Sequence, residues 1–192
     1  MNSPARGNAR DNPRVLAPPL QVSEWLNTPQ PLSLEGLRGR VVLLHAFQML
    51  CPGCVSKGLP QAQQVFETFS PEDVAVIGLH TVFEHHAAMT RVSLEAFVHE
   101  YRLSFPIGID TPAPKGDVPL TMQAYGLRGT PSLVLIDRSG VVRLHEFGHV
   151  PDLALGAVIA QLVAQPGVAL EVAGAGAGAN AQGDCGPDGC PL

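Results

Sequence analysis

Residues 40–54, RVVLLHAFQMLCPGC, place a pair of cysteines where a predicted strand meets a predicted helix. The apolar run 40–47 is typical of a buried strand, and residues 55–69 have the pattern of a helix. The first sulfur is therefore expected at a helix N-terminus, where free backbone N–H groups and the helix dipole stabilise a thiolate. Such a thiolate can attack a disulfide, and the second thiol can then release the mixed disulfide. The stretch predicts dithiol redox chemistry.

The length and charge of the chain limit its class. Its 192 residues suit one domain with tails, and a hydrophobic content of 45% is enough for a packed core. The formal net charge of −5, without a run of Lys or Arg, argues against a surface for nucleic acid or for a membrane.

The polar start, residues 1–10, lacks the apolar segment of a secretory signal. No apolar run reaches the roughly 18 residues of a membrane span. We therefore expect a cytoplasmic protein. In that compartment a cysteine pair is catalytic or metal-binding more often than structural.

Composition divides the chain into three parts. Residues 1–14 are expected to form a disordered lead and residues 15–168 a single domain. Residues 169–192 are expected to form a flexible Ala/Gly tail, which ends in a CxxxxC pair.

Strands and helices are expected to alternate along the domain before a final hairpin. The expected strands cover 40–47, 74–80, 105–109, 132–137 and 141–147. The expected helices cover 55–69, a segment that follows Ser93 as N-cap, 119–125 and 152–165. The order β-α-β-α-β-α-β-β-α predicts an α/β sandwich of three layers, in which parallel units come first and an antiparallel hairpin closes the sheet.

A second motif, Gly129-Thr130-Pro131-Ser132, directly precedes a strongly apolar strand. A proline there cannot donate to the strand ladder, so its presence indicates a geometric role. A cis Thr130–Pro131 bond would turn the Thr130 backbone toward a neighbouring loop, free to pair with an extended substrate.

Together the two motifs resemble the thioredoxin fold, and within it the thiol–disulfide oxidoreductases of the TlpA-like/redoxin (AhpC/TSA-related) family. The resemblance covers roughly residues 16–165, and its combined spacing is specific. The matching segments are 37–44, Cys51-Pro52-Gly53-Cys54, Leu59-Pro60, 105–107, Tyr125-Gly126, 129–131 and 135–140. The resemblance implies a thioredoxin-like three-layer α/β/α sandwich with a mixed central sheet.

The resemblance also implies roles for individual residues. Cys51 would be the exposed nucleophile, Cys54 the buried resolving thiol, and Pro131 a cis-proline that faces them. Pro52, Gly53 and Thr130 would line the substrate site. The redox-active Cys51–Cys54 disulfide would serve without a further cofactor. The partners would be a disulfide-containing protein or small molecule and an unidentified electron donor, and the reducing compartment favours net reduction.

Two positions depart from the family pattern. Leu50 stands directly before the first cysteine, where members usually have Trp. His45 stands six residues before Cys51, where Asp, Asn or Glu is frequent. His45 is either a core histidine with one satisfied hydrogen bond or the base that takes the Cys54 proton, since an imidazole titrates near the working pH.

Two other functions remain open. One is a peroxiredoxin-like thiol peroxidase. It is disfavoured because Leu44 and Gln48 occupy the positions where peroxidases carry Pro and Thr or Ser. The other is a non-catalytic thioredoxin-like module that uses the same edge to bind a partner or a metal, which the retention of both cysteines disfavours.

Two groups of side chains lie outside the family motifs. His80, Glu84, His85 and His86 would share the sheet edge of Cys51 if their strand is parallel to the first. They could position a substrate or bind a metal, but a solvated loop without metal is the expectation.

Cys185 and Cys190 are the second group. They close a small disulfide or stay reduced, form a weak metal site, or act as a tethered redox shuttle to Cys51. A linker of about 17 residues would reach roughly 20–25 Å.

Overall fold

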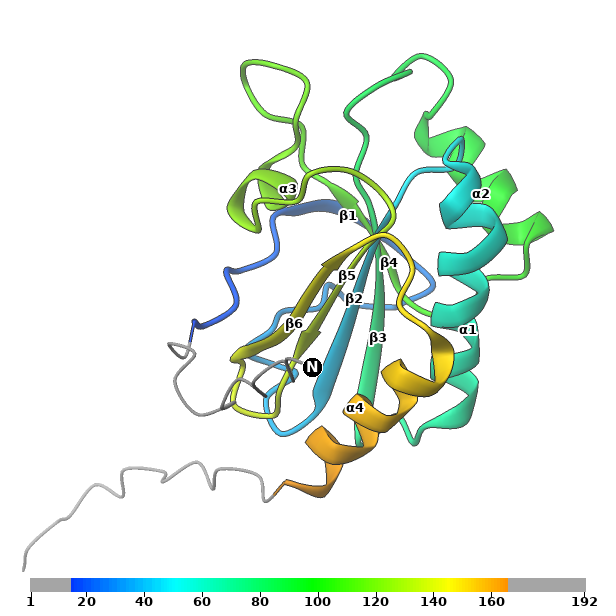
Figure 1. The fold of residues 1–192 in the computed structure, drawn as a ribbon. Helices are drawn as coiled ribbons and strands as arrows, with labels where there is room; N and C mark the ends of the chain where they lie inside the picture. Colours follow the sequence, from blue (N-terminus) through cyan, green and yellow to red (C-terminus); the bar gives the residue numbers. More distant parts are fainter. Residues whose placement is uncertain (1–14, 166–192) are drawn as a thin grey trace, which may run out of the picture.

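The computed structural model describes residues 15–165 (Figure 1). The predicted lead, residues 1–14, lies outside the described residues. So does the predicted tail, residues 169–192, with Cys185 and Cys190.

A six-stranded mixed sheet forms the centre of the domain, with the strand order β1-β4-β3-β2-β5-β6. The strands are β1 (Val22–Leu26), β2 (Val41–Phe47), β3 (Val74–His80), β4 (Ile107–Asp110), β5 (Ser132–Ile136) and β6 (Val142–Phe147). β2, β3 and β4 run parallel, whereas β1, β5 and β6 run antiparallel to their neighbours. The predicted mixed sheet and closing hairpin are confirmed.

Helices cover both faces of this sheet. They are η1 (Cys54–Gly58), α1 (Leu59–Thr68), α2 (Arg91–Glu100), α3 (Leu120–Ala124) and α4 (Asp152–Ala164). Helices α1, α2 and α4 pack on one face, while α3 and the segments around β1 cover the other (Figure 1). The predicted three-layer α/β/α sandwich is therefore confirmed.

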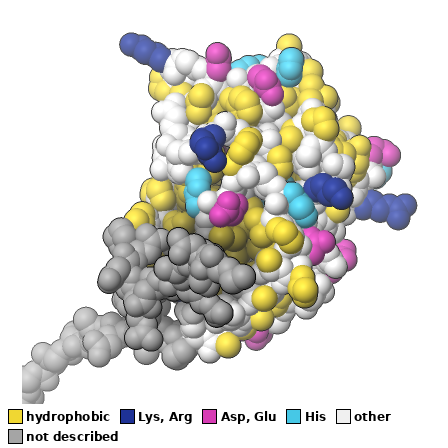
Figure 2. Space-filling view, in the orientation of Figure 1, with side chains coloured by type: hydrophobic (Ala, Val, Ile, Leu, Met, Phe, Trp, Pro, Cys, Tyr) yellow, Lys and Arg dark blue, Asp and Glu magenta, His cyan; other side chains and the backbone are white. Residues whose placement is uncertain are grey.

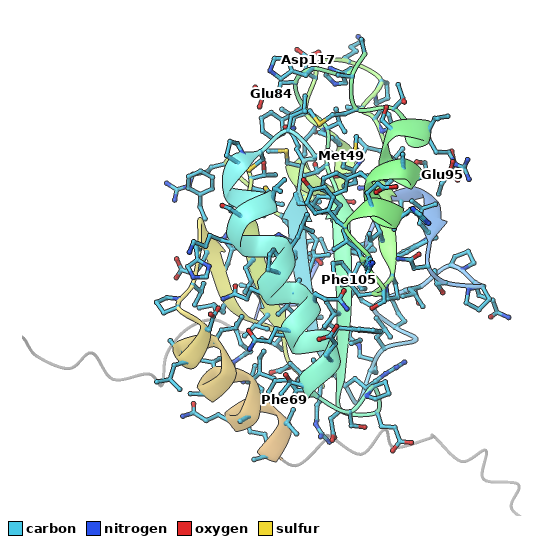
Figure 3. The ribbon with its side chains drawn as sticks, turned by 90° about the vertical axis from the view of Figure 1, so that its right-hand side faces the viewer. Met49, Phe69, Glu84, Glu95, Phe105 and Asp117 are labelled. Carbon is cyan, nitrogen blue, oxygen red and sulfur yellow. The ribbon has the colours of Figure 1, made fainter. Side chains whose placement is uncertain are left out.

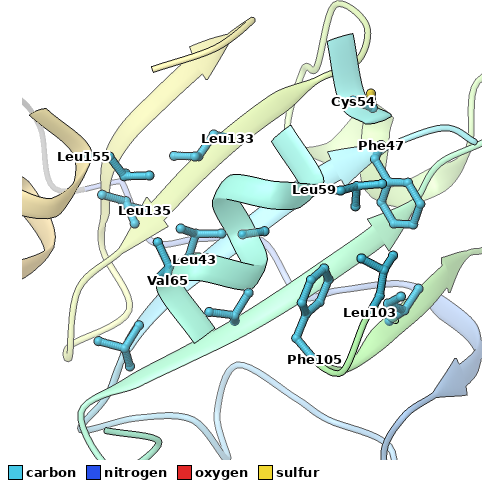
Figure 4. Packing of buried hydrophobic residues seen from close by; sticks show 14 of the residues in the cluster. Leu43, Phe47, Cys54, Leu59, Val65, Leu103, Phe105, Leu133, Leu135 and Leu155 are labelled. Carbon is cyan, nitrogen blue, oxygen red and sulfur yellow. The ribbon is translucent and has the colours of Figure 1, made fainter. Parts of the chain in front are cut away.

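Strand β2 supplies both halves of the core, because every one of its residues is buried. Leu43 and Phe47 pack toward the α1 face, where they meet Leu59 and Val65 (Figure 4). Leu44 and its alternate neighbours pack toward the α3 face. A strand covered on both faces reads as a continuous apolar run, which explains the pattern of residues 40–47.

The structure corrects two details of the predicted elements. β1 was not predicted, because its sequence VSEWL mixes polar and apolar residues and pairs only at the sheet edge. The N-cap of α2 is Thr90 and not Ser93, since the Thr90 hydroxyl accepts the Ser93 N–H. Thr and Ser are both favoured at N-caps, so residue type alone does not show which of the two begins the helix.

The surface carries no concentration of positive charge on the face shown in Figure 2, where Lys and Arg side chains are scattered among apolar and acidic ones. None of the helices within residues 15–165 is long and apolar enough to cross a membrane.

Candidate active site

The Cys-x-x-Cys segment begins just beyond the carboxyl end of β2. Cys51 is partly exposed, and Cys54 is fully buried at 0% exposure. Both are free thiols. The fold thus places one sulfur at the surface and one beneath it, the arrangement expected from the sequence.

Cys51 joins the two motifs, which lie 79 residues apart in the chain. Its thiol donates to the Thr130 carbonyl oxygen over 3.4 Å, and its sulfur accepts the Cys54 N–H over 3.2 Å. The Thr130–Pro131 peptide bond is cis. A Cβ on Gly53 would lie 3.3 Å from Pro131 Cδ, so the two loops touch at this point.

The buried thiol differs chemically from the exposed one. Burial raises the pKa of Cys54 to about 12, and its hydrogen bond with Cys51 acts in the same direction. Cys54 is therefore protonated near neutral pH, and it needs a proton acceptor before it can act as a thiolate.

The helix that follows Cys51 contains a widened turn. Residues Cys54–Gly58 form a π-helical segment, in which the Leu59 N–H donates to the Cys54 carbonyl. Pro60 follows directly; it has no N–H, and its ring cannot approach the carbonyl four residues earlier, which favours such a bulge. Widened turns of this kind recur at functional sites.

His45 packs directly beneath this turn. Its side chain is only 2% exposed, and neither ring nitrogen has a hydrogen-bond partner among residues 15–165. His45 is therefore a core histidine, as one of the two predictions had it, but the one satisfied hydrogen bond of that prediction is not found among the described residues. Burial lowers the pKa of His45 to about 4, so the ring is neutral near neutral pH and burial opposes its protonation.

Gly58 is the residue that leaves room for this ring. A Cβ at Gly58 would lie 2.5 Å from His45 Nε2 and 3.4 Å from Pro131 Cβ. Sequence reasoning missed Gly58, although a glycine two residues before Pro60 inside a predicted helix was an available signal.

Gly58→Ala is expected to lower the free energy of unfolding by about 1–3 kcal/mol, because the added methyl group overpacks the site. Gly156, in α4, is the matched control, since a Cβ there meets nothing within 4 Å. Gly156→Ala is expected to raise the free energy of unfolding by about 0.5–1 kcal/mol. Urea unfolding measures both, and equal shifts in the two variants would contradict the proposed contact.

Phe147 is a second residue that sequence reasoning missed. It ends β6 and is paired with Ser132, and its ring would lie 3.0 Å from a Cβ at Gly129. The side chain is 52% exposed, with Arg128 over the ring at 5.5 Å from its centroid. An exposed aromatic ring thus flanks the Thr130–Pro131 loop.

The group formed by His80, Glu84, His85 and His86 divides into a buried residue at the end of β3 and exposed residues in the loop that follows. β2 and β3 are parallel with Phe47 opposite His80, so the following loop does lie at the Cys51 edge, as expected from the sequence. Glu84, His85 and His86 are exposed, as a solvated loop predicts, whereas His80 is buried. Within residues 15–165, no three His, Cys, Asp or Glu side chains come together as a metal site.

Three ring side chains connect the dithiol region to His80. The rings of His45 and Phe47 are stacked with centroids 6.3 Å apart, and those of Phe47 and His80 lie 5.4 Å apart. Phe47 therefore lies in contact distance of two buried imidazoles from neighbouring strands.

Comparison with known proteins identifies a family that matches this chain. Residues 15–145 match the AhpC/TSA family. Protein DipZ of Mycobacterium bovis is 31% identical over 159 residues, which are 80% of this chain and 22% of DipZ. Thiol-disulfide oxidoreductase ResA of Halalkalibacterium halodurans is 29% identical over 62% of this chain and 61% of its own. The chain thus spans less than two thirds of the length of either relative.

Two solved structures are similar over nearly their whole length. A thiol-disulfide isomerase from Corynebacterium glutamicum is 45% identical with a TM-score of 0.77, and the match covers 80% of this chain and 99% of the isomerase. The thioredoxin-like superfamily protein SPOA0173 is 55% identical with a TM-score of 0.77, covering 79% and 98%.

Proposed function

Since the chain belongs to the AhpC/TSA family, we propose that it is a thiol–disulfide oxidoreductase that acts through Cys51 and Cys54. One observation carries the proposal: a partly exposed thiol sits between the Cys54 N–H and the Thr130 carbonyl, with a fully buried second thiol behind it. This is the geometry that attack followed by intramolecular release requires.

The reaction consists of two exchange steps. The Cys51 thiolate attacks one sulfur of a substrate disulfide, and the other sulfur leaves as a thiolate that takes up a proton. Cys54 then loses its proton and attacks Cys51 Sγ, which releases the second substrate thiol. The substrate gains two electrons and two protons, and the enzyme ends as the Cys51–Cys54 disulfide. A dithiol donor is needed to restore the reduced enzyme.

The substrate is a disulfide in a protein or a small molecule. We assign the Thr130 backbone, Pro131, Pro52 and Gly53 to its binding. The Thr130 carbonyl accepts from the Cys51 thiol, Pro131 touches the loop at Gly53, and Pro52 and Gly53 lie between the two cysteines. We place the reaction in the cytoplasm, where thiols are kept reduced and the net direction is disulfide reduction. No cofactor beyond the dithiol takes part in this scheme.

The two positions that would bind peroxide in a peroxidase do not support that alternative. Leu44 and Gln48 are both buried, and neither side chain carries the hydroxyl group of a peroxidatic site. Disulfide exchange is therefore the function that we retain.

We assign His45 the role of proton acceptor for Cys54. Its ring lies beneath the Cys54–Gly58 turn, it is neutral, and neither nitrogen has a partner among the described residues. Cys54 requires such an acceptor because its pKa is raised to about 12, whereas the pKa of His45 is lowered to about 4. Proton transfer would therefore have to give a thiolate–imidazolium pair, in which each charge favours the charged form of the other group.

His45→Ala is expected to make release of the mixed disulfide strongly dependent on pH. Without an internal base the release rate would follow the thiolate fraction of Cys54, which rises about tenfold per pH unit between pH 6 and 8. The wild-type release rate is expected to stay nearly constant over this range. Stopped-flow measurement of single-turnover release tests this. His80→Gln is the control, since His80 is also buried with a lowered pKa but lies beyond Phe47. Unchanged resolution in His45→Ala would remove the assigned role.

The proposed function itself is tested by trapping the intermediate. Cys54→Ser protein, mixed with insulin, is expected to accumulate a disulfide between Cys51 and an insulin cysteine, because the serine hydroxyl cannot release it. Peptide mass mapping identifies the linked residues, and wild-type protein with dithiothreitol should reduce insulin catalytically. The proposal would be refuted if the wild-type protein does not reduce insulin and the Cys54→Ser variant does not form the trapped disulfide.

A further inference from the structure

The chain has a second pair of cysteines, Cys185 and Cys190, which the proposed reaction does not use. Both lie outside the described residues. The sequence between them, Gly-Pro-Asp-Gly, has Pro at the second position and Gly at the fourth, as tight turns prefer. Such a turn brings its flanking residues within the reach of a disulfide, so this pair can act as a second dithiol.

The chain between the domain and this pair is long enough to reach the active site. α4 has 13 residues, which make it about 20 Å long. It leads away from the edge that carries Cys51: Figure 3 labels Met49 near one end of α1 and Phe69 at the other end, where α4 also ends. About 20 residues separate Gln165 from Cys185. A chain of that length has an r.m.s. reach of roughly 22–27 Å and a full extension of about 65–70 Å, so it can span the domain.

Only one of the two described sulfurs is open to a thiol that arrives from outside the fold. Cys51 is partly exposed, whereas Cys54 is 0% exposed. Exchange with the oxidised site therefore has to begin at Cys51 Sγ, because access decides which sulfur is attacked. A thiol tethered to the same chain meets that sulfur at an effective concentration on the order of millimolar.

Two basic side chains stand beside the cysteine site without an acidic partner. Arg128 lies over the exposed Phe147 ring, 5.5 Å from its centroid. Lys57 directly precedes Gly58, where a Cβ would lie 3.4 Å from Pro131 Cβ. Both basic residues are exposed, and neither forms an ion pair within residues 15–165.

The acidic loops of this edge lie on its other side. Glu84 and Asp117, labelled in Figure 3, follow β3 and β4, and the strand order places these strands across β2 from β5 and β6. Glu146 adjoins Phe147 in β6, but adjacent residues of a strand point to opposite faces. Residues 184–192, DCGPDGCPL, contain two aspartates and no basic residue, so they match the basic side in charge.

We propose that Cys185 and Cys190 form a second redox-active dithiol, which docks on the basic side of the active site and returns electrons to the Cys51–Cys54 disulfide. The inference rests on the proposed function, because that reaction ends with this disulfide and needs a dithiol donor. The tail pair is the internal donor, and an external dithiol restores it.

The relay consists of two exchange steps. A tail thiolate attacks Cys51 Sγ, the Cys51–Cys54 bond breaks, and Cys54 leaves as a thiolate. The second tail thiol loses its proton and attacks the first tail sulfur, which releases Cys51 as a thiolate. The Cys51–Cys54 pair gains two electrons and the tail pair loses two. The two protons that the tail thiols give up balance those that the two new thiolates take up.

The test counts the disulfide bonds that the protein reduces without an external donor. Full-length protein is reduced, freed of reductant and mixed with excess insulin, and the insulin thiols are counted by alkylation and mass spectrometry. Wild-type protein is expected to reduce about two disulfides per chain and Cys185→Ser/Cys190→Ser about one, since each dithiol supplies two electrons. A yield of about one in both overturns the relay and leaves the proposed function standing. If neither protein reduces insulin, the proposed function fails and the relay with it.

The Cys51→Ser variant separates a relay from direct reduction of insulin by the tail. In a relay the tail electrons reach insulin only through Cys51, and Cys54 is buried. This variant should therefore reduce almost no insulin in the time that the wild type needs for about two disulfides. A yield of about one disulfide per chain would show that the tail acts by itself, which would overturn the relay.

Variants with only two thiols trap the first step. Cys54→Ser/Cys185→Ser keeps Cys51 and Cys190, and Cys54→Ser/Cys190→Ser keeps Cys51 and Cys185. In dilute solution with oxidised glutathione, at least one of them is expected to form an intrachain disulfide with Cys51, identified by peptide mass mapping. The absence of this disulfide in both would overturn the proposal. The tail also competes with trapping of insulin on Cys54→Ser, so that species should last longer when both tail cysteines are replaced.

A charge variant in the same background tests the docking surface. Arg128→Gln is expected to slow formation of the intrachain disulfide roughly threefold, the effect of one exposed ion pair. Arg102→Gln is the matched control, because Arg102 is an exposed arginine that follows α2, before the start of β4 at the opposite edge of the sheet. Equal rates in the two variants would refute docking on the basic side.

Discussion

Cys51→Ser is expected to lower kcat/KM for insulin reduction by about 10³-fold or more, because a serine hydroxyl does not ionise near neutral pH. The groups that contact the Cys51 sulfur are the Cys54 N–H and the Thr130 carbonyl, and neither can act as a base for serine. The substitution changes one atom at a partly exposed position, so the fold should persist. The measurement is turbidimetric insulin reduction with dithiothreitol as donor.

Ser56→Ala is the matched control for this experiment. Ser56 is exposed on the same turn, and its hydroxyl donates to the Pro52 carbonyl at 2.7 Å. Its loss should leave the rate within about threefold of wild type, since a surface hydrogen bond contributes little. A Cys51→Ser enzyme with the wild-type rate would end the assignment of Cys51 as the nucleophile.

Acidification is expected to destabilise the protein strongly between about pH 6.5 and pH 4. His45 and His80 are buried, and burial lowers both pKa values from 6.5 to about 4. In this range the unfolded chain binds protons that the folded chain excludes, so the free energy of unfolding falls as the pH falls. Each histidine accounts for up to about 3 kcal/mol of that loss. Urea unfolding at a series of pH values measures the effect.

Two carboxyl groups with shifted pKa values also contribute, Asp110 above the usual carboxyl pKa of 3.8 and Asp137 below it. Burial raises the pKa of Asp110, which gives the opposite sign to the histidines. Burial also tends to raise the pKa of Asp137, but hydrogen bonds from Ser139, Val141 and Arg143 outweigh it, so the pKa is lowered. Asp137 therefore adds to acid destabilisation only as the pH falls through the range of a carboxyl group.

Histidine variants isolate the contribution of each ring. His45→Gln and His80→Gln should each flatten the dependence of stability on pH between 4 and 6.5, whatever they do to stability at pH 8. His99 is strongly exposed on α2, so His99→Gln should keep the wild-type profile. Wild-type stability that is constant from pH 7 to pH 4 would show that neither imidazole is excluded from protonation.

The succession of strands and helices could be predicted because buried strands and amphipathic helices leave periodic patterns. β2 is apolar throughout since both of its faces are covered, and its junction with Cys51 follows from that run. β1 escaped prediction because this edge strand has five residues, of which two adjacent ones, Ser23 and Glu24, are polar and exposed. The positions of the two thiols were predictable because the Cys-x-x-Cys segment follows the apolar run of β2 within a few residues.

The environment of the two histidines could not be predicted in the same way. His45 and His80 are polar residues within apolar strands, and whether their ring nitrogens find hydrogen-bond partners depends on residues distant in sequence. The contact of His45 with Gly58 depends on the widened turn before Pro60, which helical periodicity does not reveal. His80 was grouped with the exposed loop histidines, whereas strand pairing with β2 and β4 buries it.

Phe47 lies between two buried imidazoles, one of which packs beneath the dithiol turn. Its ring lies against both His45 and His80, so one side chain forms part of the surroundings of each ring. A substitution at Phe47 would therefore change the packing of both imidazoles at once.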